Sequence, residues 1–465
     1  MAAREESWQA GGVRIELVHD PGLGNGAYLV EVDRGRALLV DPDRRVGRYL
    51  AAAEACGWEI VAVAETHLHA DFVSGALEIS RATGADVIAP AEAEAAFPHR
   101  PVRGGQRLDL GAVELEVRAT PGHAPEHVAY VARAGSDEPA AVFSGGALIA
   151  GGAARSDLVA PERTDELSRA AFRSAREAFA DLPDDTPVYP THGGGSFCST
   201  GGGGSHTTTL GTERRTNPVL TFAGGADAFA AWWPTTFPAT PTYFARMRAV
   251  NRAGPRPVGE IPPPAPVDPH EAAALVERED VLTLDCRPAD AYARSHVQGS
   301  LAIPLRDAFP TWLGWLAPAE ARLLLVADEQ DLDAIVDACL VVGYESFAGW
   351  LRGGIEAWID EGLPVRSLPT IGPEDAVPWL EMGARPLDVR EREEFELGRI
   401  AGAVNVPLGA LAERAGELPD GRPLLAYCAS GLRSTTAASV LERIGVGPVV
   451  QLRGGYGAWR LAHVD

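Results

Sequence analysis

Short apolar runs separated by glycine and aspartate fill the first 190 residues of the chain. VRIELVHD, GAYLVEV and ALLVDP, within residues 13–42, have the length and composition of β-strands broken by turns. A helix is expected at about residues 46–57, and the strand IVAVAET follows it. A Gly/Ser/Thr-rich loop begins at residue 193, and residues 226–250 are expected to be helical around a proline-rich break. The pattern predicts an α/β domain over residues 1–250.

An internal repeat follows a proline-rich linker, which we place at residues 251–269. LDCRPADAYARSHVQGSLAIPL (284–305) matches LDVREREEFELGRIAGAVNVPL (387–408) at an offset of 103 residues. LRGGIEAW (351–358) matches LRGGYGAW (452–459) at an offset of 101. Each copy alternates strands and helices, which predicts a parallel sheet with helices on both faces. We therefore expect two related α/β modules, over residues 270–366 and 371–465.

Composition narrows the class of protein. The chain has 465 residues and a formal net charge of −23, which argues against nucleic acid or an anionic membrane as a partner. The N-terminal sequence lacks the apolar segment of a signal peptide, and no apolar run has the length of a membrane span. The five cysteines are scattered and odd in number, unlike a disulfide framework. These features predict a cytoplasmic protein with free thiols.

The second copy of the repeat carries a candidate nucleophile, Cys428. PLLAYC places this thiol at the end of an apolar strand, and CASGLRS then opens the helix TTAASVLERIGV. A thiol at a helix N-terminus lies among free backbone N–H groups, and Arg433 adds positive charge, so both favour the thiolate. The same surroundings would stabilise a persulfide on Cys428. The alternative is a buried strand-end cysteine with no chemical role.

The first copy lacks this thiol. Aligning LLLVAD (323–328) on PLLAYC (423–428) places Asp328 at the nucleophile position, and a carboxylate cannot carry sulfane sulfur. Cys286 and Cys339 lie in apolar stretches and are expected to pack in the core. The first copy is therefore predicted to be non-catalytic, with a role in packing or docking.

Three segments of the N-terminal domain bring histidines to the ends of expected strands. ETHLHADFVSG contains a His-x-His-x-Asp spacing, and alternate residues at a strand end point the same way. PGHAPEH and YPTH supply further histidines. A lone histidine is more often structural, but three such segments suggest one metal site. Its candidate ligands are His67, His69, Asp71, His123 and His192.

These motifs carry a resemblance to known families. The histidine segments resemble the metallo-β-lactamase fold over about residues 13–195. More narrowly, THLHADFVSG, PGHAPEH, YPTH and ERRTNP resemble its persulfide dioxygenase branch. CASGLR, LDVR, GAVNVP and LRGGYGAW resemble the rhodanese family over residues 371–465. Nearly the whole chain resembles bacterial persulfide dioxygenase–sulfurtransferase fusions. The resemblance implies an αββα metallo-β-lactamase sandwich followed by two α/β rhodanese-like domains.

The resemblance also implies a mononuclear Fe²⁺ site, with Zn²⁺ as the alternative. His67 and His123 match the two histidine ligands of the family, and His69 and Asp71 match positions near the metal. The third ligand is an aspartate in the family, but this chain has Gly146 there, within FSGGALIAG. His192, Asp71 or water are the candidates to replace it. Phe72, where two-metal relatives carry histidine, argues against a second metal.

Further residues are implied for sulfur and thiol handling. Cys198 lies in the glycine-rich loop after His192, where the fusion enzymes carry a cysteine that takes part in sulfur transfer; the alternative is a loop cysteine without a role. Arg155, Arg214 and Arg215 are candidates to bind the carboxylates of a glutathione- or CoA-like thiol, although surface arginines are usually only solvated.

The favoured function is sulfane-sulfur metabolism. A small persulfide would be oxidised at the metal, and Cys428 would exchange sulfur with persulfide, thiosulfate or sulfite. One alternative is a sulfurtransferase whose N-terminal domain lacks metal and only binds the thiol. A second is a metal-dependent thioester hydrolase, and a third is a non-catalytic persulfide sensor. The sequence leaves the thiol carrier, the direction of sulfur flow and assembly into a homo-oligomer open.

Overall fold

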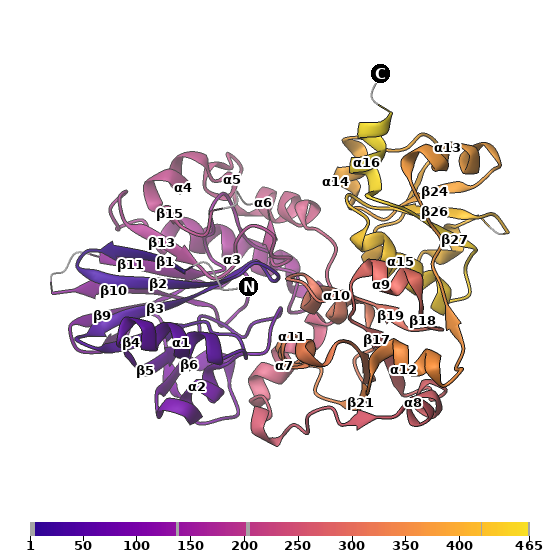
Figure 1. Ribbon diagram of the computed structural model, residues 1–465. Coiled ribbons are helices and arrows are strands. Elements are labelled where there is room, and N and C mark those ends of the chain that lie inside the picture. Colours follow the sequence, from indigo (N-terminus) through magenta and orange to yellow (C-terminus); the bar gives the residue numbers. More distant parts are fainter. Residues whose placement is uncertain (1–4, 136–138, 201–204, 420, 464–465) are drawn as a thin grey trace. The chain divides into compact units, whose positions relative to one another are not determined.

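Figure 1 shows the computed structural model of the protein, which describes residues 5–135, 139–200, 205–419 and 421–463. The chain divides into two compact units. The first comprises residues 1–261 with 337–343, and the second comprises residues 262–336 with 344–465. Among the described residues, none of the helices combines the length and apolarity that crossing a membrane requires.

The first unit is built on two mixed β-sheets. One sheet has the strand order β1-β2-β3-β4-β5-β6-β7, antiparallel as far as β4 and parallel from β4 onward. The other has the order β15-β13-β11-β10-β9-β8, and a short pair, β12 with β14, lies outside both. The strands are β1 (Glu5–Ala10), β2 (Val13–Asp20), β3 (Asn25–Asp33), β4 (Arg36–Val40), β5 (Glu59–Ala64), β6 (Asp86–Pro90), β7 (Arg100–Val102), β8 (Arg107–Asp109), β9 (Val113–Ala119), β10 (Val128–Ala134), β11 (Pro139–Gly145), β12 (Ala153–Ala154), β13 (Pro187–Pro190), β14 (Ser199–Thr200) and β15 (Thr208–Thr209).

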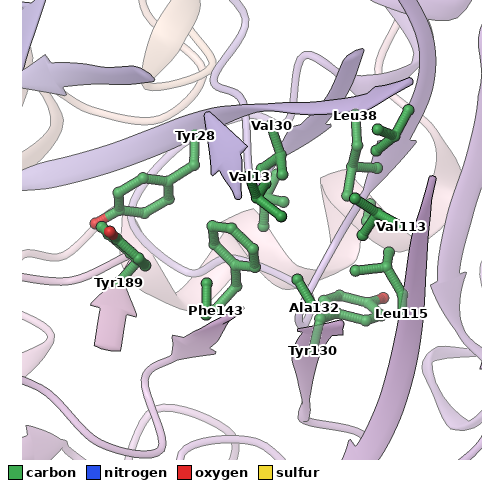
Figure 2. Packing of buried hydrophobic residues seen from close by; sticks show 14 of the residues in the cluster. Val13, Tyr28, Val30, Leu38, Val113, Leu115, Tyr130, Ala132, Phe143 and Tyr189 are labelled. Atoms are coloured by element: carbon green, nitrogen blue, oxygen red, sulfur yellow. The ribbon is translucent and has the colours of Figure 1, made fainter. Parts of the chain in front are cut away.

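The core of this unit lies between the two sheets. Tyr28 and Leu38 from the first sheet pack with Leu115, Tyr130 and Phe143 from the second, all nearly inaccessible to solvent (Figure 2). Helices α1 and α2 cover the outer face of the first sheet, and residues following α3 cover that of the second. The predicted αββα sandwich is confirmed. The helices and 3₁₀ turns are α1 (Gly47–Cys56), α2 (Ala76–Thr83), η1 (Ala91–Ala93), η2 (Pro161–Arg163), α3 (Thr164–Glu177), α4 (Leu210–Thr216), α5 (Pro218–Thr221), α6 (Ala226–Trp232), η3 (Trp233–Thr236), α7 (Phe244–Ala253) and η4 (Val258–Glu260).

The second unit contains two parallel five-stranded sheets of the same topology, as the internal repeat predicts. Their orders are β16-β21-β20-β17-β19 and β23-β27-β26-β24-β25, with β18 and β22 forming a separate pair. The strands of the first copy are β16 (Pro266–Val267), β17 (Val281–Asp285), β18 (His296–Val297), β19 (Leu301–Ala302), β20 (Arg322–Val326), β21 (Phe347–Leu351) and β22 (Val365–Arg366). Those of the second are β23 (Thr370–Ile371), β24 (Arg385–Asp388), β25 (Val404–Asn405), β26 (Leu424–Tyr427) and β27 (Val449–Leu452).

Helices connect the parallel strands of each copy (Figure 1). The boundary residues 251–269, predicted as a linker, end in β16, which pairs with β21 at the edge of the first sheet. The exact domain limits stay predictions. The helical elements are α8 (Pro269–Val276), α9 (Ala289–Arg294), α10 (Phe309–Leu316), η5 (Glu329–Asp331), α11 (Leu332–Val341), α12 (Gly354–Asp360), α13 (Pro373–Glu381), α14 (Arg392–Glu396), η6 (Leu408–Ala410), η7 (Ala415–Glu417), α15 (Leu432–Arg443) and α16 (Gly455–Ala462).

The repeated LDCR and LDVR motifs form one buried ion pair in each copy. Arg287 donates to both carboxylate oxygens of Asp285, at 2.9 and 2.6 Å, and Arg390 does the same to Asp388, at 2.9 and 2.6 Å. Both aspartates are fully buried. A buried charge that loses its partner is strongly destabilising, so these pairs hold the strand end of each copy in place.

Candidate metal centre and sulfur-carrying loop

Histidines from three segments converge in the first unit. His67 follows β5, His123 follows β9 and His192 follows β13, and all three side chains are buried. One ring nitrogen from each lies within 4.8 Å of the others. The Nε2 atoms of His67 and His192 are 3.4 Å apart. Residues far apart in sequence thus form a compact cluster of imidazoles, here called the three-histidine group.

The tautomer of His67 follows from its neighbours. Its Nδ1 lies 2.8 Å from the hydroxyl of Thr66, and that hydroxyl donates its own hydrogen to Asp41 at 2.7 Å. The hydroxyl oxygen therefore accepts from Nδ1–H of His67, which leaves a lone pair on Nε2. Burial lowers the pKa of His67 well below its ordinary value, so the ring is neutral.

His123 and His192 are oriented in the same way. Nδ1 of His123 lies 2.6 Å from the carbonyl oxygen of Arg155, which can only accept a hydrogen bond. Nδ1 of His192 lies 3.0 Å from Oδ1 of Asn25. Both rings thus carry the proton on Nδ1 and, like His67, present Nε2 as a lone pair. Burial lowers the pKa of His123 well below its usual range.

Three inward lone pairs without a proton between them fit a divalent metal ion. Two such nitrogens 3.4 Å apart would repel each other, and a cation between them removes the repulsion. Outer partners that fix the ring orientation are the usual accompaniment of metal-binding histidines. Neutral imidazole suits Zn²⁺, Fe²⁺ and Cu²⁺, so this donor set does not select one metal.

His69 belongs to two clusters of possible metal ligands, one with Asp41 and Glu65 and the other with Asp71 and His192. Nε2 of His69 lies 3.2 Å from Asp41 and 3.0 Å from Glu65. Burial acts to lower the pKa of His69, but these two carboxylates outweigh it and raise the pKa to about 10. Without a metal, His69 thus carries a positive charge beside the three-histidine group, stacked on Phe72 at 4.2 Å. It also remains a candidate metal ligand in both clusters.

Asp71 lies on the other side of His192. Its Oδ2 accepts a hydrogen bond from Nδ2 of Asn25 at 2.6 Å and lies 3.4 Å from Nδ1 of His192. Its Oδ1 is buried with no hydrogen-bond partner among the described residues. Although burial acts to raise the pKa of Asp71, His192 and His69 hold it below the ordinary value. Asp71 remains a predicted ligand, within reach of the metal site through the group it forms with His69 and His192.

Cys428 lies in the second unit, at the predicted strand-to-helix turn. It follows β26, and the N–H of Gly431, the residue before α15, points at its Sγ from 3.1 Å. Gly431 has φ of +104°, a conformation that glycine adopts without strain. The hydroxyl of Ser434 lies 3.8 Å from the sulfur. In that pair the thiol is the donor, because Ser434 gives its own hydrogen to the carbonyl of Gly431 at 2.9 Å. The loop thus directs one backbone N–H at the sulfur, that of Gly431, as a thiolate or persulfide anion requires.

The LRGGYGAW segment contacts the backbone of this loop. The N–H of Tyr456 donates to the carbonyl of Cys428 at 2.7 Å, and the N–H of Gly457 donates to that of Ala429 at 3.0 Å. A side chain on Gly455 would overlap the carbonyl oxygen of Cys428. The backbone of this motif therefore supports the loop that carries Cys428, and the close approach at Gly455 leaves no room for a side chain there.

Family models match each of these regions. A model described as "Metallo-beta-lactamase superfamily" matches residues 20–198, and one described as "Rhodanese-like domain" matches residues 268–361 and 374–462. The hydroxyacylglutathione hydrolase of Hyphomonas neptunium is 35% identical over 185 residues, covering 39% of this chain and 67% of that protein. The chain belongs to the metallo-beta-lactamase superfamily.

Two further relatives define how far the similarity extends. The hydroxyacylglutathione hydrolase of Methylobacillus flagellatus is 36% identical over 160 residues, covering 34% of this chain and 58% of that protein. The chain thus spans about three fifths of the length of the curated relatives it matches. A solved structure described as a metallo-beta-lactamase from Staphylococcus aureus subsp. aureus COL is 26% identical, with a TM-score of 0.64, over 73% of this chain and 98% of that chain.

Gly146, where the family resemblance implies an aspartate ligand, is tightly packed. Its φ lies outside the left-handed region, so the backbone itself would accept a side chain. A Cβ there would lie 2.7 Å from Cβ of Ala154 and 3.0 Å from the ring of His123. The obstacle to a carboxylate is thus packing against Ala154. The N–H of Gly146 donates to Nε2 of His127 at 2.9 Å, which removes that histidine from the candidate ligands.

Cys198 is fully buried beside the metal centre. Burial raises the pKa of its thiol well above the ordinary value, and the charge of Asp71 raises it further. Its carbonyl accepts a hydrogen bond from the N–H of Arg155. The structure brings Cys198 to Asp71, but a thiol in these surroundings stays protonated at neutral pH.

The three arginines predicted to bind a thiol cofactor differ in their surroundings. Arg155 is buried and pairs through two hydrogen bonds with Asp157, at 2.7 and 2.8 Å, and with the carbonyl of Pro238. Arg214 pairs with Asp184 and donates to the carbonyls of Phe179 and Leu182. Both guanidinium groups are fully engaged within the protein. Arg215 is exposed.

The first rhodanese-like domain offers an alanine at the nucleophile position, which corrects the alignment on Asp328. Asp285 pairs with Val326 in the first sheet, and the equivalent Asp388 pairs with Tyr427 in the second. The residue after Val326, Ala327, is therefore the counterpart of Cys428. The misalignment arose because the offset between the copies falls from 103 to 101 before this strand. A methyl group cannot carry sulfur, so the expectation of a non-catalytic copy is retained.

Asn25 was missed by the sequence analysis. It follows a turn at the start of β3, and its amide bridges His192 and Asp71, at 3.0 and 2.6 Å. A single asparagine in GLGNGAY gives no signal that it orients a histidine 167 residues later. The contact depends on the two sheets meeting, which the local sequence does not show.

Proposed function

We propose that the protein oxidises a small-molecule persulfide at a mononuclear metal in the three-histidine group and transfers sulfane sulfur through Cys428. The observation that carries the proposal is the N–H of Gly431 directed at the Cys428 sulfur from 3.1 Å. A backbone N–H directed at the sulfur beside a helix N-terminus suits a sulfur anion on Cys428. The match of the surrounding residues 374–462 to the rhodanese-like domain model supports the same role.

The transfer step at Cys428 balances without an external oxidant. The Cys428 thiolate attacks the outer sulfur of a persulfide, R–S–S⁻, forming a Cys428 persulfide and releasing the thiolate R–S⁻. Sulfite can then take the outer sulfur as thiosulfate, which returns the Cys428 thiolate. The hydrogen bond from the N–H of Gly431 favours the anionic form of the sulfur through both steps.

The oxidation proposed for the metal centre consumes O₂. One persulfide, one O₂ and one water give one thiol, one sulfite and two protons. A ferrous ion held by His67, His123 and His192 would supply open coordination positions for a persulfide and O₂. The chain itself fixes the three imidazole tautomers and places the His69 cation beside the site. That charge would favour binding of an anionic persulfide.

Glutathione is the favoured carrier of the persulfide. The curated relatives are hydroxyacylglutathione hydrolases, whose name specifies a glutathione thioester. Arg215, exposed near the end of α4, is the remaining predicted arginine free of the internal pairs described for Arg155 and Arg214. Glutathione carries two carboxylates, which an exposed guanidinium can bind.

Hydrolysis of a glutathione thioester is the second candidate function, favoured by the names of those relatives. The phenyl ring of Phe72, where the family resemblance implies histidine in two-metal relatives, opposes a second metal, which weakens this alternative. Iron-loaded and zinc-loaded protein should be compared for O₂ uptake on glutathione persulfide and for thioester cleavage. We expect O₂ uptake with iron, lost in His67→Ala. Thioester cleavage without persulfide-dependent O₂ uptake would contradict the proposal.

A further inference from the structure

The segment that carries His67, His69 and Asp71 has no regular secondary structure. Residues 65–73, which follow β5, form neither helix nor strand, and all of them are buried. Buried backbone N–H and carbonyl groups outside helices and sheets need other hydrogen-bond partners. The partners of this segment therefore determine where its candidate metal ligands lie.

Asn251, on helix α7, supplies three of these partners. Its Nδ2 donates to the carbonyls of His69 and Phe72, both at 2.9 Å, and its Oδ1 accepts from the N–H of Ser74 at 2.9 Å. Because carbonyls only accept and an N–H only donates, the three bonds define one orientation of the amide. The side chain is buried. This single residue thus fixes the backbone on both sides of Asp71.

Tyr243, the residue before α7, binds the backbone of Asp71 itself. Its buried hydroxyl donates to the carbonyl of Asp71 at 2.8 Å. Tyr243, Met247 and Asn251 recur every four residues, so they lie on one face of the helix. That face of α7 is thus directed at the ligand-bearing segment.

Arg248 of the same helix connects this segment with the one that carries His123. It donates to both carboxylate oxygens of Glu126, at 2.9 and 3.0 Å, and to the carbonyl of Leu68 at 3.1 Å. Glu126 in turn accepts from the N–H of Leu68 at 3.1 Å. Leu68 lies between the two histidines of its motif, and Glu126 follows His123 by three residues. The ion pair therefore ties the two ligand-bearing segments to each other.

These contacts of α7 are polar and act on the backbone. A helix that only covered the site would contact it through apolar side chains, whereas these bonds are directional and specify where the chain runs. Loss of one of them would leave buried carbonyl oxygens without a partner, and the segment would shift to satisfy them. Metal binding tolerates only small departures of ligand distances from their preferred values. A shift of this segment should therefore lower metal affinity.

We propose that α7 positions the metal centre through Asn251 and Tyr243, with the Arg248–Glu126 pair anchoring the helix at the second ligand-bearing segment. Both are positioning residues, since α7 contributes none of the possible metal ligands found among the described residues. The inference rests on the metal centre of the proposed function and not on its oxidation chemistry.

Co²⁺ is a suitable probe, because its visible absorption spectrum reports the number and geometry of its ligands. Full-length Asn251→Ala should bind Co²⁺ about tenfold or more weakly than the wild type, as for other outer partners of metal ligands, and its Co²⁺ spectrum should change. Affinity is measured by competition with a chelator. The free energy of unfolding of the metal-free protein is measured separately with denaturant.

Asn217→Ala is the matched control. Asn217 is another buried asparagine of the same unit, and its amide likewise donates to two backbone carbonyls, those of Gly152 at 2.9 Å and Ile149 at 3.3 Å. This variant should lose stability as Asn251→Ala does, but it should keep the wild-type Co²⁺ affinity and spectrum.

Tyr243→Phe is a milder variant that removes one hydroxyl and keeps the ring, so it supplies the test if Asn251→Ala does not fold. Its Co²⁺ affinity should fall about fivefold, the loss expected for one hydrogen bond. Folded variants that lose stability but keep the wild-type affinity and spectrum would show a purely structural role and overturn the inference. Wild-type protein that binds Co²⁺ but shows no persulfide-dependent O₂ uptake with iron would contradict the proposed function alone. Wild-type protein that binds neither metal would contradict both.

Discussion

The two chemical centres of this chain are assembled in different ways. The three-histidine group joins side chains that follow β5, β9 and β13, and each ring is oriented by a separate acceptor. The centre around Cys428 comes from one loop between β26 and α15, and the backbone N–H of Gly431 is directed at the sulfur. One centre depends on where distant segments meet, and the other depends on the path of a few consecutive residues.

This difference determines how each centre should respond to substitution. At Cys428 the position of the sulfur depends on the path of the backbone. A methyl group that displaces this loop should therefore reduce the rate of sulfur transfer strongly. At the metal centre, metal affinity depends on how the histidine rings are oriented. Loss of one outer hydrogen-bond acceptor should therefore weaken metal binding without abolishing it. Substitutions in each centre, paired with a control variant elsewhere in the same unit, test whether the two centres depend on their surroundings in these different ways.

The largest effect is expected for Cys428→Ser. A hydroxyl in place of the thiol cannot form a persulfide, so sulfur transfer from thiosulfate to a thiol acceptor should fall by at least about a thousandfold. Persulfide-dependent O₂ uptake by the iron-loaded protein should remain, because the metal centre is assembled separately. Transfer at the wild-type rate would show that another thiol is the carrier.

Gly455→Ala should reduce transfer by roughly a hundredfold. The added methyl group meets the carbonyl oxygen of Cys428 and requires the loop to move, and displacement of a reacting group by about 1 Å has effects of this size. Its counterpart Gly354→Ala, at φ of +65° in the first copy, introduces a comparable backbone strain away from the nucleophile. Equal losses in the two variants would indicate a general effect on folding.

Asn25→Ala should weaken metal binding by about tenfold or more, since outer partners of metal-binding histidines contribute on this scale. The variant removes the acceptor for Nδ1 of His192 and the donor to Asp71. Asn217→Ala, which removes another buried asparagine of the same unit, is the control for general destabilisation. Metal affinities measured by competition with a chelator should be lower for Asn25→Ala than for Asn217→Ala. Equal affinities of the two variants would contradict the orienting role of Asn25.

The smallest effect, a gain, is expected at Gly146. Gly146→Asp alone should be poorly tolerated because its Cβ meets Ala154 at 2.7 Å. In Gly146→Asp with Ala154→Gly that contact is removed, and the carboxylate adds an anionic oxygen ligand next to His123. Iron occupancy after anaerobic loading should then rise a few-fold over wild type. No gain in the double variant would show that the carboxylate cannot reach the metal.

Much of the fold was predictable because the periodic signals are strong. The internal repeat predicted two parallel sheets of one topology, and the family resemblance of the histidine motifs implied the sandwich. The Cys428 loop could also be predicted, because the strand end, the glycine and the start of the helix follow one another in the sequence. The arrangement around Gly431 is a local property of CASGLRS.

The remaining features depend on contacts between distant segments. The charge state of His69 follows from Asp41 and Glu65, and the engagement of Arg155 follows from Asp157 and a carbonyl 83 residues later. The position of Ala327 became clear from strand register, because two residues are lost between the repeated motifs. Spacing alone could bring the histidines together, but it could not assign their tautomers.

The central claim is that sulfane sulfur is held on Cys428, and mapping the site of added sulfur tests it most directly. Wild-type protein treated with thiosulfate should gain one sulfur, located by peptide mass spectrometry on the segment containing Cys428. The buried thiols of Cys198 and Cys339 should stay unmodified, since burial raises the pKa of both. Sulfur found on Cys198, or retained in full by Cys428→Ser, would contradict the account.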